Sequence, residues 1–373
     1  MTDDTPIRIA HLTVYRDLPA GIRKQIRYES EGRTRLDDAE WTPCAVHSGR
    51  LIEDFEHRIP WIFRPVLLRS LYGWIVIMRL GRQYDYVLVR HMAFDPFALV
   101  FAPLIRNRIS VHHSKEVEEL PLIRPGWPGR LAALIERVAG RVAVRCSMGV
   151  LGVTSEIARY ECETRAPGKP HSTYPNGIDL STVPVADDRR SATETHIVFI
   201  CEFFSAWHGL DRLLDAVAAA PARTPELTIH LIGNISDLHR AQLAALGERQ
   251  STFRVHGFLD PDAYREVLAF ADAGLGSLAM DRQNLHEGAT LKVREMLAMG
   301  LPVCSGHRDT ALADDFAYYR YQPTVDIADL HAFARQMKHA QRDQVREAAA
   351  PFIGKVGAMQ NVVDWLKQTF PAG

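Results

Sequence analysis

Cysteine is scarce in this sequence, and its five copies follow no pattern. Cys44, Cys146, Cys162, Cys201 and Cys304 lie far apart, no two of them form a Cys-x-x-Cys pair, and three fall in apolar runs. Zinc sites and disulfide frameworks place cysteines at short or regular spacings. The sequence therefore predicts reduced core thiols, as in a cytoplasmic protein, and neither disulfides nor zinc ligands.

Long apolar runs are also missing, as is a strong net charge. No uninterrupted apolar stretch approaches the roughly 20 residues that span a membrane as a helix. The first residues, Met1–Asp4, are acidic where a secretory signal is basic, and the formal net charge is only -1. We therefore expect a cytoplasmic protein with no transmembrane segment and no general affinity for nucleic acid.

What the sequence does contain is an alternation of short apolar strands and helices over 373 residues, enough for two domains. Strands are predicted at 7–14, 84–91, 109–113 and 148–155, and then at 195–200, 227–233, 253–259 and 273–278. This alternation favours parallel sheets in doubly wound α/β domains. Ligands of such sheets gather at the carboxyl ends of the strands, so polar residues that follow a strand are candidates for a site.

The most informative stretch is His286–Val303. Gly288 lies in a loop, residues 290–299 are predicted to form a short helix, Gly300 ends it, and a buried strand follows. A helix that begins directly after a glycine-containing loop presents unpaired N–H groups and a positive dipole end, which together bind phosphate. Lys292, in the first turn, adds a cation for a diphosphate.

Two carboxylates flank the start of this helix, Glu287 in the loop and Glu295 within the helix. Their offset of eight residues is about 80° from whole helical turns, so they do not share one face of the helix. A carboxylate accepts hydrogen bonds from two vicinal hydroxyl groups, such as those of a ribose or a hexose. The alternative is an amphipathic helix with solvated glutamates, which is the better interpretation of a glutamate pair alone.

The pattern Glu-x7-Glu followed by Ala-x-Gly-x-Pro-Val, from Glu287 to Val303, resembles the donor-site signature of the retaining glycosyltransferases of the GT-B fold, family 4 type. Pro175-Asn176-Gly177-Ile178-Asp179 resembles a second signature of that family, located where its first domain ends. The resemblance implies two doubly wound, Rossmann-like α/β domains facing across a cleft. It places an acceptor-side domain at 1–180, a donor-binding domain at 181–352, and a final helix at 353–373 that crosses back to the first domain.

The resemblance also implies roles for the residues that match the signature. The second glutamate, here Glu295, holds the nucleotide ribose in that family, and the first, here Glu287, faces the transferred sugar. The helix start with Gly288, Thr290 and Leu291 holds the diphosphate, and the lysine beside it supports this role.

The loop after the first strand of the second half departs from the family pattern. Glu202 and Phe203 stand where the family usually has Gly-Arg, and His208 replaces a lysine. The diphosphate then has fewer fixed cations, and His208 donates a hydrogen bond when neutral or supplies a charge when protonated. Gly257 and Phe258 match the position at which backbone groups of the family contact the nucleotide base.

The first half matches the resemblance only at the ends of its strands. Gly21 lies at a strand-to-helix turn, which is a weak phosphate-loop feature when a single glycine forms it. His112 and His113 follow the strand that begins at Ile109, and the family places a strand-end histidine beside the transferred sugar. Either histidine fits that position, and a pair of surface histidines is the alternative.

Residues 59–82 are apolar with interspersed arginines, including Arg64, Arg69, Arg79 and Arg82. Two interpretations stay open: a helix lying on an anionic membrane surface, and a core helix of the first domain. Residues 1–180 hold 25 Lys and Arg against 21 Asp and Glu, a mild basic excess that favours an acceptor at such a surface.

The resemblance implies transfer of a sugar from a nucleotide diphosphate donor to a hydroxyl group of a glycan or lipid-linked acceptor, as in bacterial-type surface polysaccharide synthesis. It further implies a retained anomeric configuration, no metal, and no cofactor besides the donor substrate. Two alternatives remain: a nucleotide-sugar 2-epimerase, which uses two such domains, and a non-catalytic adaptor, because the Gly-Arg pair is missing. We expect a cytoplasmic enzyme that works on the inner face of a membrane.

Overall fold

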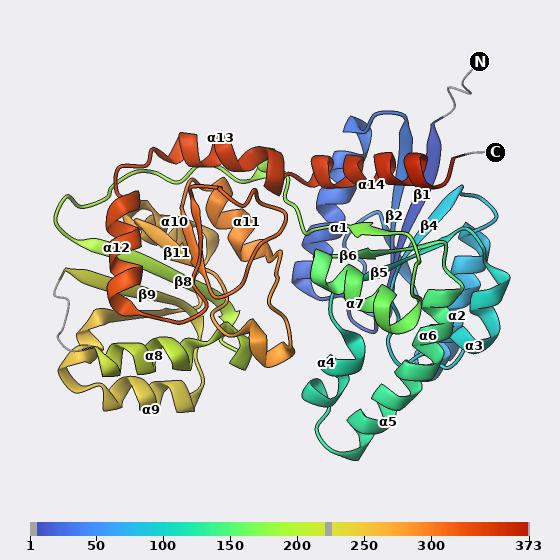
Figure 1. The fold of residues 1–373 in the computed structure, drawn as a ribbon, viewed down its shortest axis with the longest axis horizontal. Coiled ribbons are helices and arrows are strands. Elements are labelled where there is room, and N and C mark those ends of the chain that lie inside the picture. Colours follow the sequence, from blue (N-terminus) through green and yellow to red (C-terminus); the bar gives the residue numbers. More distant parts are fainter. Residues whose placement is uncertain (1–5, 221–225, 372–373) are drawn as a thin grey trace. The chain divides into compact units, whose positions relative to one another are not determined.

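The structure is a computed structural model that describes residues 6–220 and 226–371, so the acidic start at Met1–Asp4 lies outside the described residues. The chain forms two compact units (Figure 1). Unit 1 consists of Met1–Asp179 and Gly354–Gly373, and unit 2 of Leu180–Ile353. The bar in Figure 1 identifies unit 1 by its blue-to-green segments and the final red helix.

Unit 1 is built on a parallel sheet of seven strands in the order β3-β2-β1-β4-β5-β6-β7. Its middle strands are buried on both faces, which explains why their sequences are almost continuously apolar. The strands are β1 (Ile7–Val14), β2 (Ala39–His47), β3 (Glu56–Arg58), β4 (Tyr86–Arg90), β5 (Arg108–His112), β6 (Gly149–Gly152) and β7 (His171–Thr173).

Helices cover both faces of this sheet. Apolar residues of the last helix pack on Ile9, Leu88 and Ile109 on one face, whereas Trp74, Ala98 and Ala143 belong to the core of the other face. The helices are α1 (Ala20–Gly32), α2 (Val66–Leu80), α3 (Ala98–Phe101), α4 (Glu116–Ile123), α5 (Trp127–Ile135), α6 (Arg141–Arg145), α7 (Ser155–Arg165) and α14 (Lys355–Thr369).

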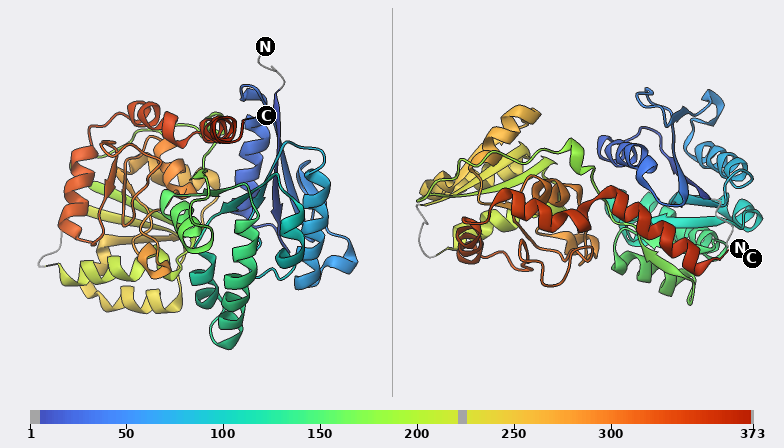
Figure 2. Two further views of the ribbon diagram at one scale, coloured as in Figure 1. Left: turned by 45° about the vertical axis from the view of Figure 1, so that its right-hand side comes forward. Right: turned by 90° about the horizontal axis from the view of Figure 1, so that it is seen from above.

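Unit 2 has a parallel sheet of six strands in the order β10-β9-β8-β11-β12-β13. Its strands are β8 (Thr195–Phe203), β9 (Leu227–Asn234), β10 (Phe253–Gly257), β11 (Ala273–Leu275), β12 (Val303–Ser305) and β13 (Tyr319–Tyr321). Its helices are α8 (Leu210–Ala219), α9 (Asp237–Ala245), α10 (Pro261–Phe270), α11 (Leu291–Ala298), α12 (Ile327–Met337) and α13 (Arg342–Ile353). Two further views show both units from other directions (Figure 2).

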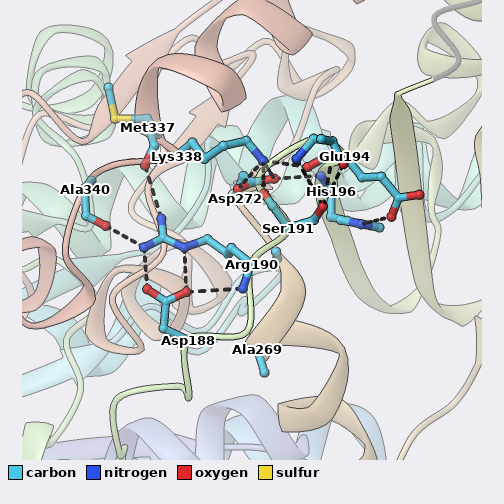
Figure 3. A network of polar contacts seen from close by, with 12 residues as sticks. Asp188, Arg190, Ser191, Glu194, His196, Ala269, Asp272, Met337, Lys338 and Ala340 are labelled. Atoms are coloured by element: carbon cyan, nitrogen blue, oxygen red, sulfur yellow. Dashed lines mark hydrogen bonds and ion pairs between the residues drawn. The ribbon is translucent and has the colours of Figure 1, made fainter.

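The segment that enters unit 2 is held by a polar network rather than left as a loose linker (Figure 3). Arg190 pairs with Asp188 and donates to the carbonyls of Met337, the last residue of α12, and of Ala340 beyond it. Lys338 donates to the carbonyl of Ser191 at 2.7 Å. The polar residues that precede β8 therefore bind the end of α12 and position β8.

The predicted fold class, two parallel-sheet α/β domains, is confirmed, with changes in detail. Gly21 lies in the first turn of α1, which begins at Ala20, and not in a turn before the helix. Thr154 caps α7 by accepting a hydrogen bond from the N–H of Ile157, so the strand predicted at 148–155 ends before this cap. Helices α5 and α6 are joined through a π turn.

The apolar segment 59–82 divides into an exposed first part and a buried second part, which fits a core helix for the second part and leaves the membrane interpretation a prediction. Trp74 and Ile77 of α2 are fully buried in the unit 1 core. Trp61, Leu67 and Leu68, before and at the start of the helix, are exposed by 77%, 47% and 39%. The second half is thus a core helix, and the first half is an apolar surface. Within the described ranges, no helix is both long and apolar enough to cross a membrane.

Candidate functional site

The loop before α11 is shaped by close packing around Gly288. A Cβ atom on Gly288 would lie 2.6 Å from the ring of His307 and 2.8 Å from the sulfur of Met280, so only glycine fits there. The backbone of Glu287 bridges that of Arg308, and the N–H of Gly288 donates to the carbonyl of the same residue at 2.8 Å. These contacts fix the direction in which α11 begins.

The amino end of α11 has the features of an anion site. Its first N–H groups have no partner within the helix, and Thr290, the capping residue by position, makes no side-chain cap to them. The hydroxyl oxygen of Thr290 is buried and has no hydrogen-bond partner in the described part of the chain. A buried donor without a partner is costly, so this arrangement suits a bound phosphate oxygen.

Lys292 lies in the first turn of α11, as predicted, and points to the end of β8. Its Nζ lies 3.1 Å from the sulfur of Cys201 and 5.6 Å from the ring centroid of Phe199. Burial lowers the pKa of Lys292, and burial raises the pKa of the Cys201 thiol, which therefore stays neutral. A thiol is a weak acceptor, so the ammonium gains much from an arriving anion.

His208 belongs to the loop after β8, and this loop is bonded to the loop after β11. The N–H of Leu278 donates to the carbonyl of His208 at 2.9 Å, and Nδ1 of His208 accepts from the N–H of Ser205 at 2.9 Å. Burial, and then the charge of Lys292, lower the pKa of His208 to about 3. His208 is therefore neutral at pH 7, and with Nδ1 used as an acceptor its proton sits on Nε2. Of its two predicted roles, the neutral donor fits and the charged one does not.

The two glutamates lie on either side of the helix start, as their spacing predicts. Glu287 precedes α11, and its carboxylate accepts a hydrogen bond from the hydroxyl of Thr310 at 3.3 Å. Glu295 is half-buried on the side of α11 and lies near Tyr264 of α10. Burial raises the pKa of the Tyr264 phenol, and the charge of Glu295 raises it further. Arg294, between them, is fully buried and pairs with Asp309, which ties α11 to the loop after β12.

The end of β10 leaves room beside the backbone. Gly257 has a positive φ of 69°, no atom lies within 4 Å of the place where its Cβ would be, and Phe258 is 70% exposed. Asp260 and Asp262, next along the chain, form an Asp-x-Asp pair, whose carboxylates could bind a metal ion. Asp260, however, caps α10, and Asp262 pairs with Arg265, so this pair is explained by the helix start.

In unit 1, the structure distinguishes between the two neighbouring histidines. His112 is fully buried, its Nε2 lies 2.8 Å from the hydroxyl of Ser110, and its Nδ1 lies 3.0 Å from Glu116. Both ring nitrogens are thus occupied by protein groups. His113 is half-buried, and its Nδ1 has no hydrogen-bond partner among the described residues. Of the two, only His113 has a ring nitrogen left for a substrate.

The surroundings of His112 form a buried polar cluster with one possible metal geometry. His91, His112 and Glu116 offer ligand atoms within 4.8 Å of one another. Nε2 of His91, however, lies 2.7 Å from Glu136, and Arg165 pairs with Glu136 and Glu161. The guanidinium already supplies the positive charge here, so we interpret the cluster as a structural core and not as a metal site.

Sequence reasoning missed a second buried group in unit 1. Glu29 of α1 accepts hydrogen bonds from Tyr174 at 2.8 Å and Lys355 at 3.0 Å, and it lies 2.8 Å from Nδ1 of His11. Burial holds the pKa of His113 well below its usual value, and the charges of Arg90, His11 and Lys355 lower it further. His113 therefore lies near the buried group around Glu29. The available signal was His11, a polar residue inside the apolar strand β1.

Gly21, the predicted phosphate-loop glycine, keeps that role as a prediction. It lies within the first turn of α1, is exposed, and has open space around its Cβ position. An alanine would fit there, so nothing local requires glycine.

Comparison with known proteins adds to this geometry. Residues 194–343 match the family model "Glycosyl transferases group 1". This segment lies within unit 2 and contains the whole arrangement around α11. No curated protein sequence matches the chain.

Solved structures resemble the chain over nearly its full length. HepE of Anabaena, in complex with UDP and glucose, has a TM-score of 0.64 and 16% identity, with 97% of this chain and 100% of HepE covered. WaaB, a lipopolysaccharide outer core galactosyltransferase, has a TM-score of 0.65 and 14% identity, covering 98% and 100%. Sucrose-phosphate synthase of Thermosynechococcus elongatus has a TM-score of 0.63 and 13% identity, covering 98% and 100%.

These comparisons confirm the GT-B fold that the sequence predicted, and residues 194–343 match the family model of the group 1 glycosyl transferases. The prediction of a glycosyltransferase is therefore confirmed at the level of fold and domain. The roles of individual site residues stay predictions.

Proposed function

We propose that the protein transfers a sugar from a nucleotide diphosphate donor to a hydroxyl group of a glycan or lipid-linked acceptor, with retention of anomeric configuration and without a metal ion. The observation that carries this proposal is the start of α11, where free N–H groups, the unpartnered hydroxyl of Thr290 and the ammonium of Lys292 converge. Each of these groups favours a bound diphosphate.

The residues around the helix start have separate parts in this proposal. The N–H groups of Leu291 and Lys292, the Lys292 ammonium and Nε2–H of His208 would bind the diphosphate and stabilise the charge that develops as it leaves. The Glu295 carboxylate would accept hydrogen bonds from the ribose hydroxyls, and Glu287 would face the transferred sugar. No step needs a divalent cation, because the leaving charge meets these donors directly.

We assign the acceptor-side histidine to His113, since His112 has no free ring nitrogen. The related fold of WaaB, which acts on lipopolysaccharide, and the arginine-rich apolar surface of unit 1 favour a lipid-linked acceptor in surface polysaccharide synthesis. We propose that the enzyme works on the cytoplasmic face of a membrane.

A screen of nucleoside diphosphates and nucleotide sugars for protection against thermal unfolding tests the donor half of the proposal. A ligand at about 100 times its Kd stabilises the folded state by about 2.7 kcal/mol, which such a scan resolves. Absence of protection by every nucleotide would favour the adaptor, and isomerisation of the donor without any acceptor would favour the epimerase. Transfer that persists in excess chelator supports metal independence, and its loss would remove that part of the proposal.

A further inference from the structure

Helix α5 of unit 1 buries its small residues and exposes its large apolar residues, which is the reverse of a helix that packs on a core. The side that it turns to the protein consists of small residues, Gly129, Ala132 and Ala133, which are buried. The side that it turns outward carries Trp127, exposed by 74%, and Leu134, exposed by 56%. Exposing large apolar side chains while burying alanines costs stability in water, so this surface is adapted to a different environment.

The exposed apolar surface extends over the whole hairpin formed by α4 and α5, which projects from the rest of unit 1 (Figures 1 and 2). We call it the hairpin surface, and it consists of Leu122, Ile123, Trp127, Leu131, Leu134 and Val138. In unit 2 the exposed large apolar residues are scattered over separate elements, at Phe203, Leu238, Val255, Phe258 and Phe270. Unit 1 gathers its exposed large apolar residues on the hairpin, within residues 51–75 and at 99–104.

The exposed charges around the hairpin surface have one sign, whereas the acidic residues of α4, Glu116, Glu118 and Glu119, lie in its first turn and are buried or half-buried. Arg124, Arg130, Arg137 and Arg141 are exposed on it. The single acidic residue between 120 and 155 is Glu136, which is buried and paired with Arg165. Arginines interspersed with tryptophan and leucine on one helix face are the composition of helices that lie in the interface of an anionic bilayer.

The neighbouring helices of the same sheet face continue this composition. Trp74 of α2 stacks on Phe101 of α3 at 6.3 Å, and α3 and α6 belong to the same core. Outward of this core, α3 exposes Leu99 and Val100. Residues 57–84, which include α2, contain five arginines and no acidic residue.

We propose that the hairpin surface inserts into an anionic phospholipid bilayer, with its arginines on lipid phosphates and Trp127, Leu131 and Leu134 among the acyl chains. An anionic bilayer is the proposed occupant because every exposed charged residue between 120 and 155 is an arginine, which complements the negative charge of lipid phosphates. The purpose of this contact rests on the proposed function. Insertion of the hairpin surface would hold unit 1 at the membrane in which a lipid-linked acceptor resides.

Sedimentation of the full chain with vesicles tests this proposal, comparing phosphatidylcholine alone with phosphatidylcholine containing phosphatidylglycerol. We expect binding to the anionic vesicles only. The triple variant Arg124→Gln, Arg130→Gln, Arg137→Gln should weaken this binding about 100-fold, since each arginine near such a surface contributes about a fivefold factor. The variant Trp127→Ser, Leu131→Ser, Leu134→Ser should weaken it at least about tenfold.

A matched control removes the same chemistry elsewhere. Leu238 and Arg240 lie exposed on α9 of unit 2, so Leu238→Gln with Arg240→Gln should leave vesicle binding unchanged. All substituted side chains are exposed, and unchanged thermal unfolding would show that the variants fold.

Three results would overturn the proposal. The unmodified chain could fail to bind anionic vesicles, or the α9 control could lose as much vesicle binding as the hairpin variants. The chain could also form an oligomer that the hairpin substitutions dissociate, with no vesicle binding. Calorimetry with nucleoside diphosphates separates this outcome from the proposed function. Vesicle binding without nucleotide binding would refute the function and keep the docking surface, and the reverse would refute only the docking surface.

Discussion

Replacement of Lys292 by methionine separates its expected role at the diphosphate from its role in the fold. In the unliganded protein the ammonium has Cys201 and the ring of Phe199 as its neighbours, and burial lowers its pKa. A methionine of similar length removes a weak hydrogen bond and a cation–π contact, together worth about 1 kcal/mol, and also removes the cost of burying a charge. We therefore expect the free energy of unfolding to change by less than about 1 kcal/mol.

Nucleotide binding should respond very differently to the same change. A hydrogen bond from an ammonium to a phosphate contributes about 1.5 to 3 kcal/mol, which corresponds to a factor of about 10 to 150 in Kd. Isothermal titration calorimetry with nucleoside diphosphates measures this factor directly, and denaturant unfolding measures stability on the same preparation.

Lys338 provides the control, because it is a lysine of the same unit with a structural role (Figure 3). Its Nζ donates to the carbonyls of Ser191 and Glu194 and pairs with the buried Asp272. Lys338→Met should lower the free energy of unfolding by about 3 kcal/mol, because a buried carboxylate loses its cation, and should leave nucleotide affinity unchanged. Unchanged nucleotide affinity in Lys292→Met, or a stability loss as large as that of the control, would refute the assignment.

Three further predictions concern the carboxylates, the histidines and acid. Glu295→Ala should weaken donor binding about tenfold, measured by calorimetry, whereas Glu287→Gln should lower turnover more than affinity; the opposite pattern would exchange their roles. His113→Ala should reduce transfer at nearly unchanged stability, and His112→Ala should destabilise unit 1 by about 2 kcal/mol because Glu116 loses its buried partner; wild-type activity of His113→Ala would contradict our choice. Burial lowers the pKa of His112 to about 4. Between about pH 6.5 and 4, His112 is therefore protonated in the unfolded chain and neutral in the folded one. The free energy of unfolding falls over this range with decreasing pH, by up to about 3 kcal/mol. Denaturant titrations at several pH values check this, and a His112→Gln variant with an equally steep pH dependence would refute it.

The sequence predicted the donor-side geometry well because the features there are local. A loop glycine, a lysine one position into a helix and a glycine that ends it are encoded within fifteen residues, and the structure places all of them as expected. The strands that bear apolar runs were found for the same reason. Strands β2, β3, β7 and β13 were not, because Ala39–His47 contains polar residues and a proline, and the other three are only three residues long.

The parts that could not be predicted depend on contacts between residues far apart in the sequence. Glu29 and Lys355 are separated by more than 300 residues, and only packing of α14 on α1 brings them together. The same limit applied to the adjacent histidines. Neighbours on an extended strand point to opposite sides, but sequence alone does not show which side holds Glu116. Exposure of the large side chains of α5 was likewise invisible, since helical spacing predicts two faces without showing which one is covered.

The departures from the family pattern have a physical consequence for the donor site. Where the family usually has fixed cations, this chain has Phe203, exposed by 51%, and a neutral His208. Neutral donors, unlike cations, bind a diphosphate with little long-range attraction, so the affinity of this site should depend on Lys292 and on the N–H groups of α11 more than in relatives with the full set. The weak acceptor beside Lys292 fits this proposal, because a carboxylate in place of Cys201 would compete with a phosphate for the Lys292 ammonium.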